Sequence, residues 1–426
     1  MIAISAEREL ALDAVLRLRE AGYQALWAGG CVRDLLLGYD PTDYDVATSA
    51  TPDQVRQVFG RRRTLPVGAS FGVIIVLGTP PQAGQIDVAT FRTDAAYSDG
   101  RRPDAVTFST PEEDALRRDF TINGMFYDPL AEQVIDYVAG QADLQRKLVR
   151  AIGRAADRIA EDKLRMLRAI RIAARFGFAI EPHTRQAIAD QASQVEVVSG
   201  ERIWSEVRKT LDSGRPAWGL AEWAELGLLQ PILPEVAEHW PARHVDMTSI
   251  LHAAADRPWL VRWCGLLWAA VGSTPLAVSE AMSSLKSRLK LANEICAAVK
   301  YALTAQPALE QAEHKLWSAV QPWLVDPSAG LAVDLLELRA RIAPPRTAPT
   351  LAATAGWLRE RMCSQVHPLD PPPLLIGRDL IELGLKPGPR FKQLLSHARQ
   401  LQLDRLLADR PAALQWLNGQ IDSDKS

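Results

Sequence analysis

Two aspartates separated by one residue, Asp43 and Asp45, have the residue type and spacing of a metal site. On a β-strand, side chains two positions apart project from the same face, so the two carboxylates would repel each other without a cation between them. Mg²⁺ prefers one or two carboxylates together with substrate phosphates. A lone pair of this kind is more often a solvated turn, so the interpretation depends on the residues around it.

A glycine pair and an arginine precede the aspartates. Gly29 and Gly30 end a short apolar run, and Arg33 follows three residues later. Residues without side chains let backbone N–H groups approach a phosphate closely, and a guanidinium can bind the same group. With Asp43 and Asp45 after them, these residues predict nucleotidyl transfer from a nucleoside triphosphate, with Mg²⁺ as the cofactor.

A third carboxylate, Asp87, lies in the strand-like run 85–91. On a strand beside the aspartate pair it would complete a catalytic cluster of three carboxylates. An edge-strand aspartate in solvent is an equally good interpretation of the spacing. The polar segment 93–103, which contains Gly100 and Pro103, is expected to be a mobile loop that could gate the site.

A basic segment follows between residues 146 and 175, with ten Lys or Arg residues against three acidic residues. Such an excess is typical of a surface that binds a phosphate-rich ligand. Within it, four charged residues recur every three positions, which on one helix would place them along a slanting stripe. The stripe consists of Asp162, Arg165, Arg168 and Arg171. Neighbours in it could act as one hydrogen-bonding pair on a base, or they could form a solvated salt bridge.

The composition of the chain excludes several classes of protein. Its 426 residues are 47% hydrophobic with a net charge of −2, which suits a soluble globular protein without a uniformly basic surface. No run reaches the roughly 20 apolar residues of a membrane span, and the N-terminus lacks signal-peptide features. We therefore expect a cytoplasmic protein that is not associated with a membrane. Four scattered cysteines indicate neither a zinc site nor a disulfide framework. No protein partner is indicated.

Periodicity divides the chain near residue 140. Before it, helices are expected over 5–21, 33–38 and 51–59, with strands over 43–47, 72–77, 85–91 and further strand-like segments up to residue 137. After residue 143 the strand signals vanish and helical periodicity continues to the C-terminus. Proline-rich breaks at 343–350 and 368–373 bracket a helix of about 15 residues. The expected fold is an α+β head followed by an all-α part.

Four motifs in this order resemble the class II tRNA nucleotidyltransferase (CCA-adding enzyme) and bacterial poly(A) polymerase family. They are the glycine pair with its VRD, the DYD pair, the run RRDFTIN and the segment EDKLRMLRAIRIAARFGF, followed by SGERIW at 199–204. The resemblance implies a polymerase-β-like nucleotidyltransferase head over 1–140, a helical neck that recognises the base over 141–212, a helical body over 213–342 and an RNA-binding tail over 343–426.

The resemblance also implies roles for single residues. Asp43 and Asp45 would hold Mg²⁺, Gly30 and Arg33 would bind the triphosphate, and Arg118 would bind the nucleotide. Asp162 and Arg165 would pair with the Watson–Crick edge of cytosine or adenine, with Arg168 and Arg171 supporting them and the triphosphate. The partners implied are ATP, CTP and the 3′ end of tRNA.

Several activities remain open at this point. The pattern from Glu161 to Arg165 resembles CCA-adding members more than poly(A) polymerases, but addition of A alone or of a poly(A) tail stays possible. A non-catalytic RNA-binding protein and a small-molecule nucleotidyltransferase are alternatives from other classes. Many relatives carry an adjacent His-Asp phosphohydrolase signature in the body, whereas this chain reads LLWAAVG at 266–272, so we expect a degenerate, structural body.

Overall fold

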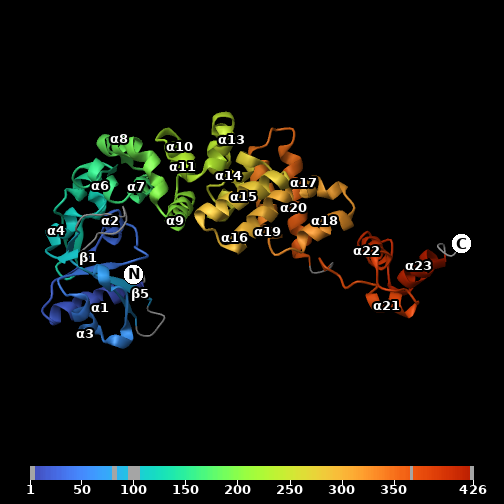
Figure 1. The fold of residues 1–426 in the computed structure, drawn as a ribbon, viewed down its shortest axis with the longest axis horizontal. Coiled ribbons are helices and arrows are strands. Elements are labelled where there is room, and N and C mark those ends of the chain that lie inside the picture. Colours follow the sequence, from blue (N-terminus) through green and yellow to red (C-terminus); the bar gives the residue numbers. More distant parts are fainter. Residues whose placement is uncertain (1–4, 79–83, 95–105, 365–367, 423–426) are drawn as a thin grey trace. The chain divides into compact units, whose positions relative to one another are not determined.

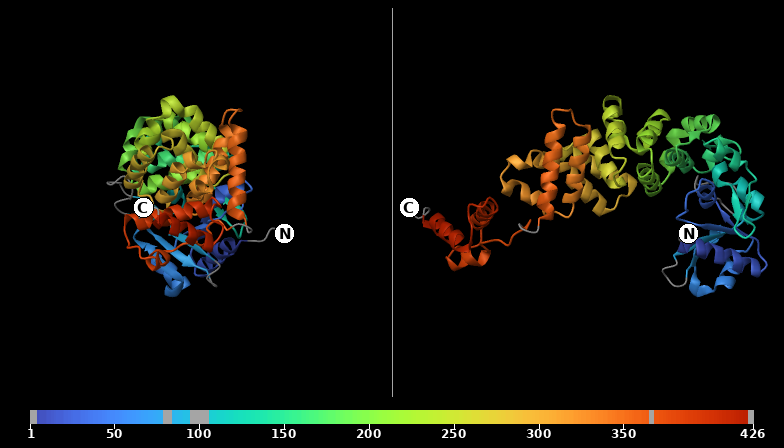
Figure 2. Two further views of the ribbon diagram at one scale, coloured as in Figure 1. Left: turned by 90° about the vertical axis from the view of Figure 1, so that its right-hand side faces the viewer. Right: turned by 180° about the vertical axis from the view of Figure 1, so that it is seen from behind.

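The computed structural model describes residues 5–78, 84–94, 106–364 and 368–422 (Figures 1 and 2). The chain forms two compact units, Met1–Pro234 and Glu235–Ser426. The expected α+β fold followed by an all-α part is confirmed, because the mixed sheet of the described residues lies in the first unit and the second unit is helical.

A seven-stranded sheet with the strand order β3-β4-β5-β2-β1-β8-β9 organises the first part of the chain. Its strands are β1 (Ala25–Ala28), β2 (Asp45–Thr48), β3 (Thr64–Gly68), β4 (Val73–Leu77), β5 (Gln85–Thr90), β8 (Phe126–Asp128) and β9 (Gln133–Ile135). β2 and β5 pair in parallel, and the other neighbours pair antiparallel. A separate hairpin joins β6 (Arg92–Asp94) to β7 (Val106–Phe108).

Two helices cover one face of this sheet, α1 (Ala6–Glu20) and α3 (Pro52–Phe59) (Figure 1). α1 packs against β1, β2 and β5 through its buried apolar stripe, and a capping box starts α3 at Thr51. Val46 and Val88 are buried in the two parallel strands. Because side chains alternate along a strand, Asp45 and Asp87 project from the opposite face. That face is where the candidate site lies.

The first unit contains nine further α-helices among the described residues. They are α2 (Gly30–Leu36), α4 (Pro111–Leu116), α5 (Gly140–Gln145), α6 (Ala155–Glu161), α7 (Leu164–Phe176), α8 (Pro182–Gln191), α9 (Gly200–Leu211), α10 (Pro216–Glu225) and α11 (Leu229–Ile232). The apolar face of α7 packs against α9 and α10, and Gly177, at φ 70°, ends α7 in the left-handed conformation that glycine adopts without strain. The opposite, arginine-bearing side of α7 is thereby left for the site.

In the second unit, α19 packs against several other helices, whereas α21, α22 and α23 share a separate hydrophobic core. Its helices are α13 (Trp240–Ala253), α14 (Trp259–Val271), α15 (Pro275–Leu289), α16 (Asn293–Thr304), α17 (Gln306–Leu309), α18 (Trp317–Leu324), α19 (Ala329–Ile342), α20 (Ala348–Cys363), α21 (Gly377–Glu382), α22 (Pro389–Leu403) and α23 (Arg410–Asp422); α12 (Pro234–Ala237) spans the division between the units. α19 contacts α13, α14, α16 and α20.

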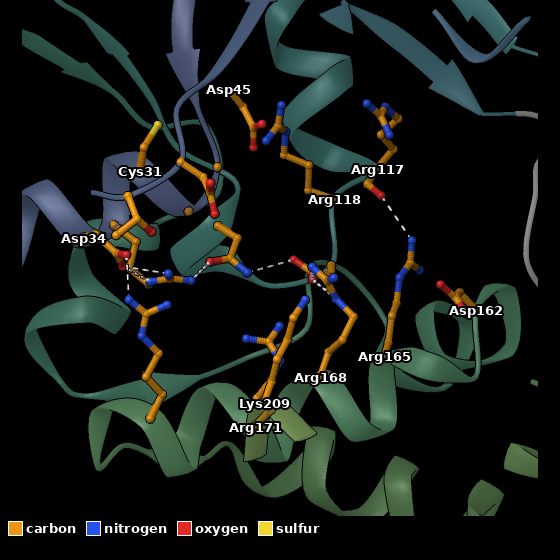
Figure 3. Close-up of a pocket in the computed structure, with 18 of the residues that line it drawn as sticks. Cys31, Asp34, Asp45, Arg117, Arg118, Asp162, Arg165, Arg168, Arg171 and Lys209 are labelled. Carbon is orange, nitrogen blue, oxygen red and sulfur yellow. Dashed lines mark hydrogen bonds and ion pairs between the residues drawn. The ribbon is translucent and has the colours of Figure 1, made fainter. Parts of the chain in front are cut away.

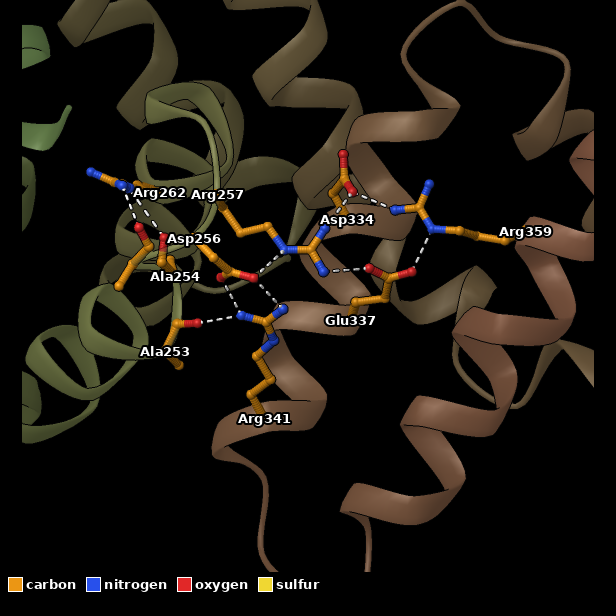
Figure 4. Close-up of polar contacts among 10 residues, drawn as sticks. Ala253, Ala254, Asp256, Arg257, Arg262, Asp334, Glu337, Arg341 and Arg359 are labelled. Atoms are coloured by element: carbon orange, nitrogen blue, oxygen red, sulfur yellow. Dashed lines mark hydrogen bonds and ion pairs between the residues drawn. The ribbon is translucent and has the colours of Figure 1, made fainter.

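Ion pairs also join these helices. Arg257 donates to Glu337 at 2.8 Å and to Asp334 at 3.3 Å, and Arg359 on α20 binds the same two carboxylates (Figure 4). The shared acids connect the α13–α14 turn to α19 and α20. Because these side chains are 22–41% exposed, water screens the ion pairs and each contributes little to net stability.

Two local expectations were wrong, and one strand was missed. Strands do continue after residue 143, as a parallel pair of two-residue strands, β10 (Leu148–Val149) and β11 (Ala179–Ile180). Within the run RRDFTIN, Thr121–Asn123 is a 3₁₀ helix rather than a strand. β3 was not anticipated, and its burial pattern is that of an exposed edge, without a clean alternation. Most of the predicted loop 93–103 lies outside the described residues; Thr93 and Asp94 belong to β6.

Candidate active site

A cavity of about 610 Å³ in the first unit, here called the active-site cavity, brings together most of the predicted residues (Figure 3). Side chains from the sheet edge and α2 face those of α7 across it. Its cationic side chains are Arg33, Arg92, Arg117, Arg118, Arg165, Arg168, Arg171, Arg175 and Lys209, and its acidic ones are Asp34, Asp43, Asp45, Asp119 and Asp162. Nine cations against five acids give the cavity a positive charge, which favours an anionic ligand such as a triphosphate.

The aspartate pair lies at one wall of the cavity. Asp45 is the first residue of β2, whereas Asp43 lies in the turn before it, so the expected strand begins two residues late. Burial raises the pKa of Asp45 to about 6; Arg118 opposes the shift, and repulsion by Asp87 and Asp43 adds to it. Two carboxylates that repel each other in this way form the hard oxygen donor set that a divalent cation would stabilise.

Asp87 is the register partner of Asp45 in the parallel pair of β2 and β5. Its pKa is raised, first by burial and then by Asp43. Asp87 does not line the active-site cavity, however, and within the described residues no group of three or more His, Cys, Asp or Glu side chains is arranged to hold a metal ion. A cation here would therefore rely on Asp43 and Asp45 together with ligand phosphates and water.

Position 29 requires a residue without a side chain. Its backbone has φ 77°, and a Cβ atom would lie 3.1 Å from Nη1 of Arg118 and 3.8 Å from Oδ2 of Asp45. A larger residue would be strained and would push into the space between these two side chains. Gly30 starts α2, and a Cβ there would make ordinary contact with Arg33 at 3.5 Å.

Arg33 is buried and held in one orientation. It donates twice to Oδ1 of Asp34, at 2.6 and 2.8 Å, and through Nη1 to Oδ1 of Asn123 at 2.6 Å. Its guanidinium lies 4.6 Å from the ring centre of Phe176 on α7. Arg175 binds the other oxygen of Asp34 at 3.0 Å. These contacts tie the start of α2 to the end of α7.

Arg118 is fixed by a buried carboxylate. Its Nε and Nη2 donate to Oδ2 of Asp114 at 3.1 and 2.9 Å, while Arg117 binds Oδ1 of the same residue. Burial raises the pKa of Asp114, but the two guanidinium groups outweigh it and the pKa is lowered. Asp114 thus stays ionised and holds both arginines at the cavity.

The predicted stripe on one helix is wrong for its first member. α6 ends at Glu161, Asp162 is extended at φ −142°, and α7 starts at Leu164. The physical reason is the aspartate itself, because Oδ1 of Asp162 accepts the N–H of Leu164 at 3.1 Å and so satisfies a free donor of the new helix. Asp162 and Arg165 therefore lie on either side of a helix boundary, and both line the cavity.

Asp162 and Arg165 have separate side-chain partners, and a backbone hydrogen bond from the N–H of Arg165 to the carbonyl of Asp162, at 3.0 Å, joins them. Oδ2 of Asp162 accepts Nη2 of Arg202 on α9 at 2.7 Å. Arg165 binds Glu161 and donates through Nη1 to the carbonyl of Arg158 at 2.7 Å. These partners hold both side chains in place. The hydrogen-bonding atoms that the partners do not use remain for a ligand in the cavity.

The next two arginines of α7 are also anchored by acids. Arg168 donates through Nε to Oδ2 of Asp119 at 2.8 Å, and Arg171 binds the buried Glu206 of α9. Burial alone would raise the pKa of Asp119, but Arg168 and the side chain of Asn123 lower it. Asn123 donates to Asp119 at 3.1 Å and accepts from Arg33, so one chain of contacts runs from α2 to α7.

Sequence reasoning missed the residues that hold these arginines. Asp114 stands three and four positions before Arg117 and Arg118, which is the spacing of partners on one turn of helix and could have indicated it. Arg202 and Glu206 lie in and just after the SGERIW motif, whose partners no local pattern reveals. Lys209 and Arg175 also line the cavity.

A mixed sheet with Asp45 on one of its strands and Asp43 just before it, at the wall of a cationic cavity, is the arrangement expected of a nucleotidyltransferase. Residues 25–150 match the family model described as the poly A polymerase head domain, and residues 177–239 match the one described as the probable RNA and SrmB-binding site of polymerase A. Two separate segments of the chain thus each match a family model named after a polymerase of this kind.

Relatives that match nearly the whole chain identify the family of nucleotidyltransferases more closely. A CCA-adding enzyme from Levilactobacillus brevis is 32% identical over 413 residues, which covers 95% of this chain and 96% of the relative. One from Geobacillus stearothermophilus is 35% identical over 394 residues, 90% of each chain. The chain belongs to the CCA-adding enzyme family.

Solved structures agree with this assignment. A crystal structure of the Bacillus stearothermophilus CCA-adding enzyme in complex with CTP is similar over 98% of both chains, with a TM-score of 0.78 and 29% identity. The Thermotoga maritima CCA-adding enzyme complexed with tRNA shares the fold, with a TM-score of 0.64 at 20% identity over 97% of this chain and 95% of that one. In the part of the chain that the structure describes, no helix is both long and apolar enough to cross a membrane.

Proposed function

We propose that this protein adds cytidine and adenosine nucleotides from CTP and ATP, without a nucleic-acid template, to the 3′ terminus of tRNA. The observation that carries the proposal is the active-site cavity, whose lining includes Asp43 and Asp45 as well as Asp162 and Arg165. One cavity can therefore hold the triphosphate at one wall and the base at the other. tRNA, CTP and ATP occur together in the cytoplasm, so we expect the protein to act there.

Asp43 and Asp45 are the residues that would hold Mg²⁺. When bound, the ion supplies charge neutralisation at the triphosphate and lowers the pKa of a coordinated hydroxyl. The fit rests on the raised pKa of Asp45, since a cation between the two carboxylates removes the repulsion that contributes to it. Asp87, as the register partner of Asp45, adds negative charge next to this pair.

Arg33 and Arg118 would bind the triphosphate and the nucleotide. The contacts of Arg33 with Asp34 and Asn123 use three of its five N–H groups, so two remain for phosphate oxygens. Arg118 keeps Nη1 beside Gly29, where a phosphate can approach the bare backbone. Because acids already hold both guanidinium groups, little side-chain entropy is lost when the substrate binds.

Asp162 and Arg165 would select the base. Cytosine and adenine share an exocyclic amino group beside a ring acceptor, whereas uracil and guanine present a carbonyl oxygen there. Each carboxylate oxygen of Asp162 can accept a further hydrogen bond besides those from Arg202 and Leu164. A carboxylate accepts from an amino group and repels a carbonyl, so the site favours C and A.

A tRNA transcript that lacks its last three nucleotides tests this function. Incubation with CTP, ATP and Mg²⁺ should lengthen the transcript by three nucleotides. RNA of unchanged length would contradict the proposal and would favour a protein that binds RNA without catalysis.

A further inference from the structure

A second cavity, of about 440 Å³, lies in the second unit and is lined by two tryptophans. Trp317 at the start of α18 and Trp357 on α20 meet edge to face, with ring centres 5.8 Å apart at 82°. Both indoles are partly exposed, and we call Trp317, Trp357 and Arg361 the indole platform. A tryptophan side chain offers a large, rigid aromatic surface on which a flat ring can stack.

Arg361 completes the platform. Its guanidinium carbon lies 5.5 Å from the ring centre of Trp317 and 5.2 Å from that of Trp357. Across the described ranges, no carboxylate lies within ion-pair distance of Arg361, so its charge is not neutralised by the protein. A guanidinium stacked on indole and free of acid partners is suited to an anion that carries a flat ring.

The other charges around the cavity add to this preference. Its two acids are already engaged, since Glu313 accepts from Thr354 at 2.6 Å and Asp404 accepts from the backbone and side chain of Ser318 at 2.8 and 2.7 Å. Lys315 and Arg405 supply further positive charge. Three cations, Lys315, Arg361 and Arg405, against the two carboxylates leave the lining of this cavity with a net positive charge, which favours a phosphate.

We propose that the indole platform binds an unpaired nucleotide of the RNA substrate, with its base stacked on the indoles and its phosphate against Arg361. An unpaired nucleotide is required because only a base outside a double helix offers a free face for stacking. Every residue that lines this cavity belongs to the second unit, whereas the active-site cavity lies within the first. The nucleotide bound here is thus not the 3′ end that reacts. The inference rests on the proposed function, which supplies the RNA.

The test measures the dissociation constant of the full chain for a tRNA transcript that lacks its last three nucleotides. Trp357→Ala should weaken binding about 5- to 100-fold, the range for loss of one stacked base. Arg361→Met, which removes a charge without opening the core, should weaken binding and lower the slope of log Kd against log salt by about 1. Trp240→Ala is the matched control, because Trp240 is a partly buried tryptophan on α13 that lines neither cavity. It should bind RNA as the unaltered protein does.

Equal affinity of the Trp357→Ala and Trp240→Ala chains would overturn the inference, as would an unchanged salt slope in Arg361→Met. Nucleotide incorporation by the unaltered protein is measured separately. If incorporation is absent while Trp357→Ala still weakens RNA binding, the proposed function fails and the platform stands. If incorporation is normal while the affinities are equal, the platform alone fails.

Discussion

Asp45 on β2 and Asp87 on β5 are register partners in a parallel strand pair, so their carboxylates lie side by side on the face of the sheet away from α1. Each has a raised pKa, mainly through burial and then through the neighbouring acids, with Arg118 opposing the shift at Asp45. The ionised forms of Asp45 and Asp87 therefore destabilise the folded protein when no cation is bound between the acids.

The pH dependence of stability should show this effect. The folded pKa of Asp45, about 6, lies above the ordinary value of 3.8, so its favourable contribution is present below 3.8 and is lost as the pH rises through 6. Without divalent cations, Asp45→Asn should therefore gain stability over the unaltered protein between pH 4 and pH 8, by about 1 kcal/mol after allowance for solvent screening. Urea unfolding of both proteins measures the difference, and Mg²⁺ should reduce it. Parallel loss of stability in the two proteins would contradict the effect.

Loss of either member of the aspartate pair should abolish nucleotide incorporation. Asp43→Ala or Asp45→Ala removes groups that act mainly on the transition state, so incorporation should fall at least about 1000-fold while RNA affinity stays nearly unchanged. Rates at saturating RNA and CTP, with a separate RNA binding curve, measure the two quantities. Asp53→Ala, on the exposed first turn of α3, is the control and should be fully active. An Asp45→Ala protein with normal turnover would remove Mg²⁺ binding from this pair.

Nucleotide selection should depend on Asp162 and Arg165. Asp162→Ala should lower the preference for CTP over UTP by about 10- to 100-fold, the range for one well-made base contact. Arg165→Ala should lower incorporation of both CTP and ATP. Competition between labelled CTP and UTP measures the preference, with Asp190→Ala on the outer part of α8 as a control. If Asp162→Ala keeps full selectivity and only lowers the melting temperature, the ion pair of Asp162 with Arg202 is purely structural.

Two glycine substitutions in helices of the second unit should have opposite effects on the stability of the protein. A Cβ at Gly265 in α14 would lie 2.8 Å from Leu338 and 3.2 Å from Ile250, whereas one at Gly356 in α20 would meet nothing within 4 Å. Gly265→Ala should destabilise the protein by about 1–3 kcal/mol through overpacking. Gly356→Ala should stabilise it by about 0.5–1 kcal/mol, because alanine loses less backbone entropy in a helix. Thermal unfolding compares them, and equal effects would show that α14 has room to shift.

The sequence predicted the head from features that are local in the chain. The glycine pair, the aspartates and the arginines of α7 all line one cavity. Strand alternation places Asp45 there and helical periodicity places the arginines, whereas Asp43 lies before the strand. The helix boundary at Asp162 was missed because the charge periodicity continues across it, although Asp162 itself is extended and its side chain accepts from the first residue of α7. Two-residue strands such as β10 are too short to show a period of two.

The partners of the site arginines were harder to predict for another reason. Asn123 and Glu206 meet their arginines through tertiary packing, and residue spacing reports only neighbours on the same element, as it does for Asp114. Asp87 shows the reverse case, since its spacing suggested a third ligand while the fold places it beside the pair and outside the cavity.

The length and composition of the RNA product test the central claim most directly. Transcripts of one tRNA that lack three, two, one or none of their 3′-terminal nucleotides are incubated with CTP alone, ATP alone or both. The account predicts two C residues from CTP alone on the shortest transcript, completion with one A when ATP is added, and no growth of the complete tRNA. A long A tail, A added only to transcripts that already end in CC, or no growth at all would contradict it.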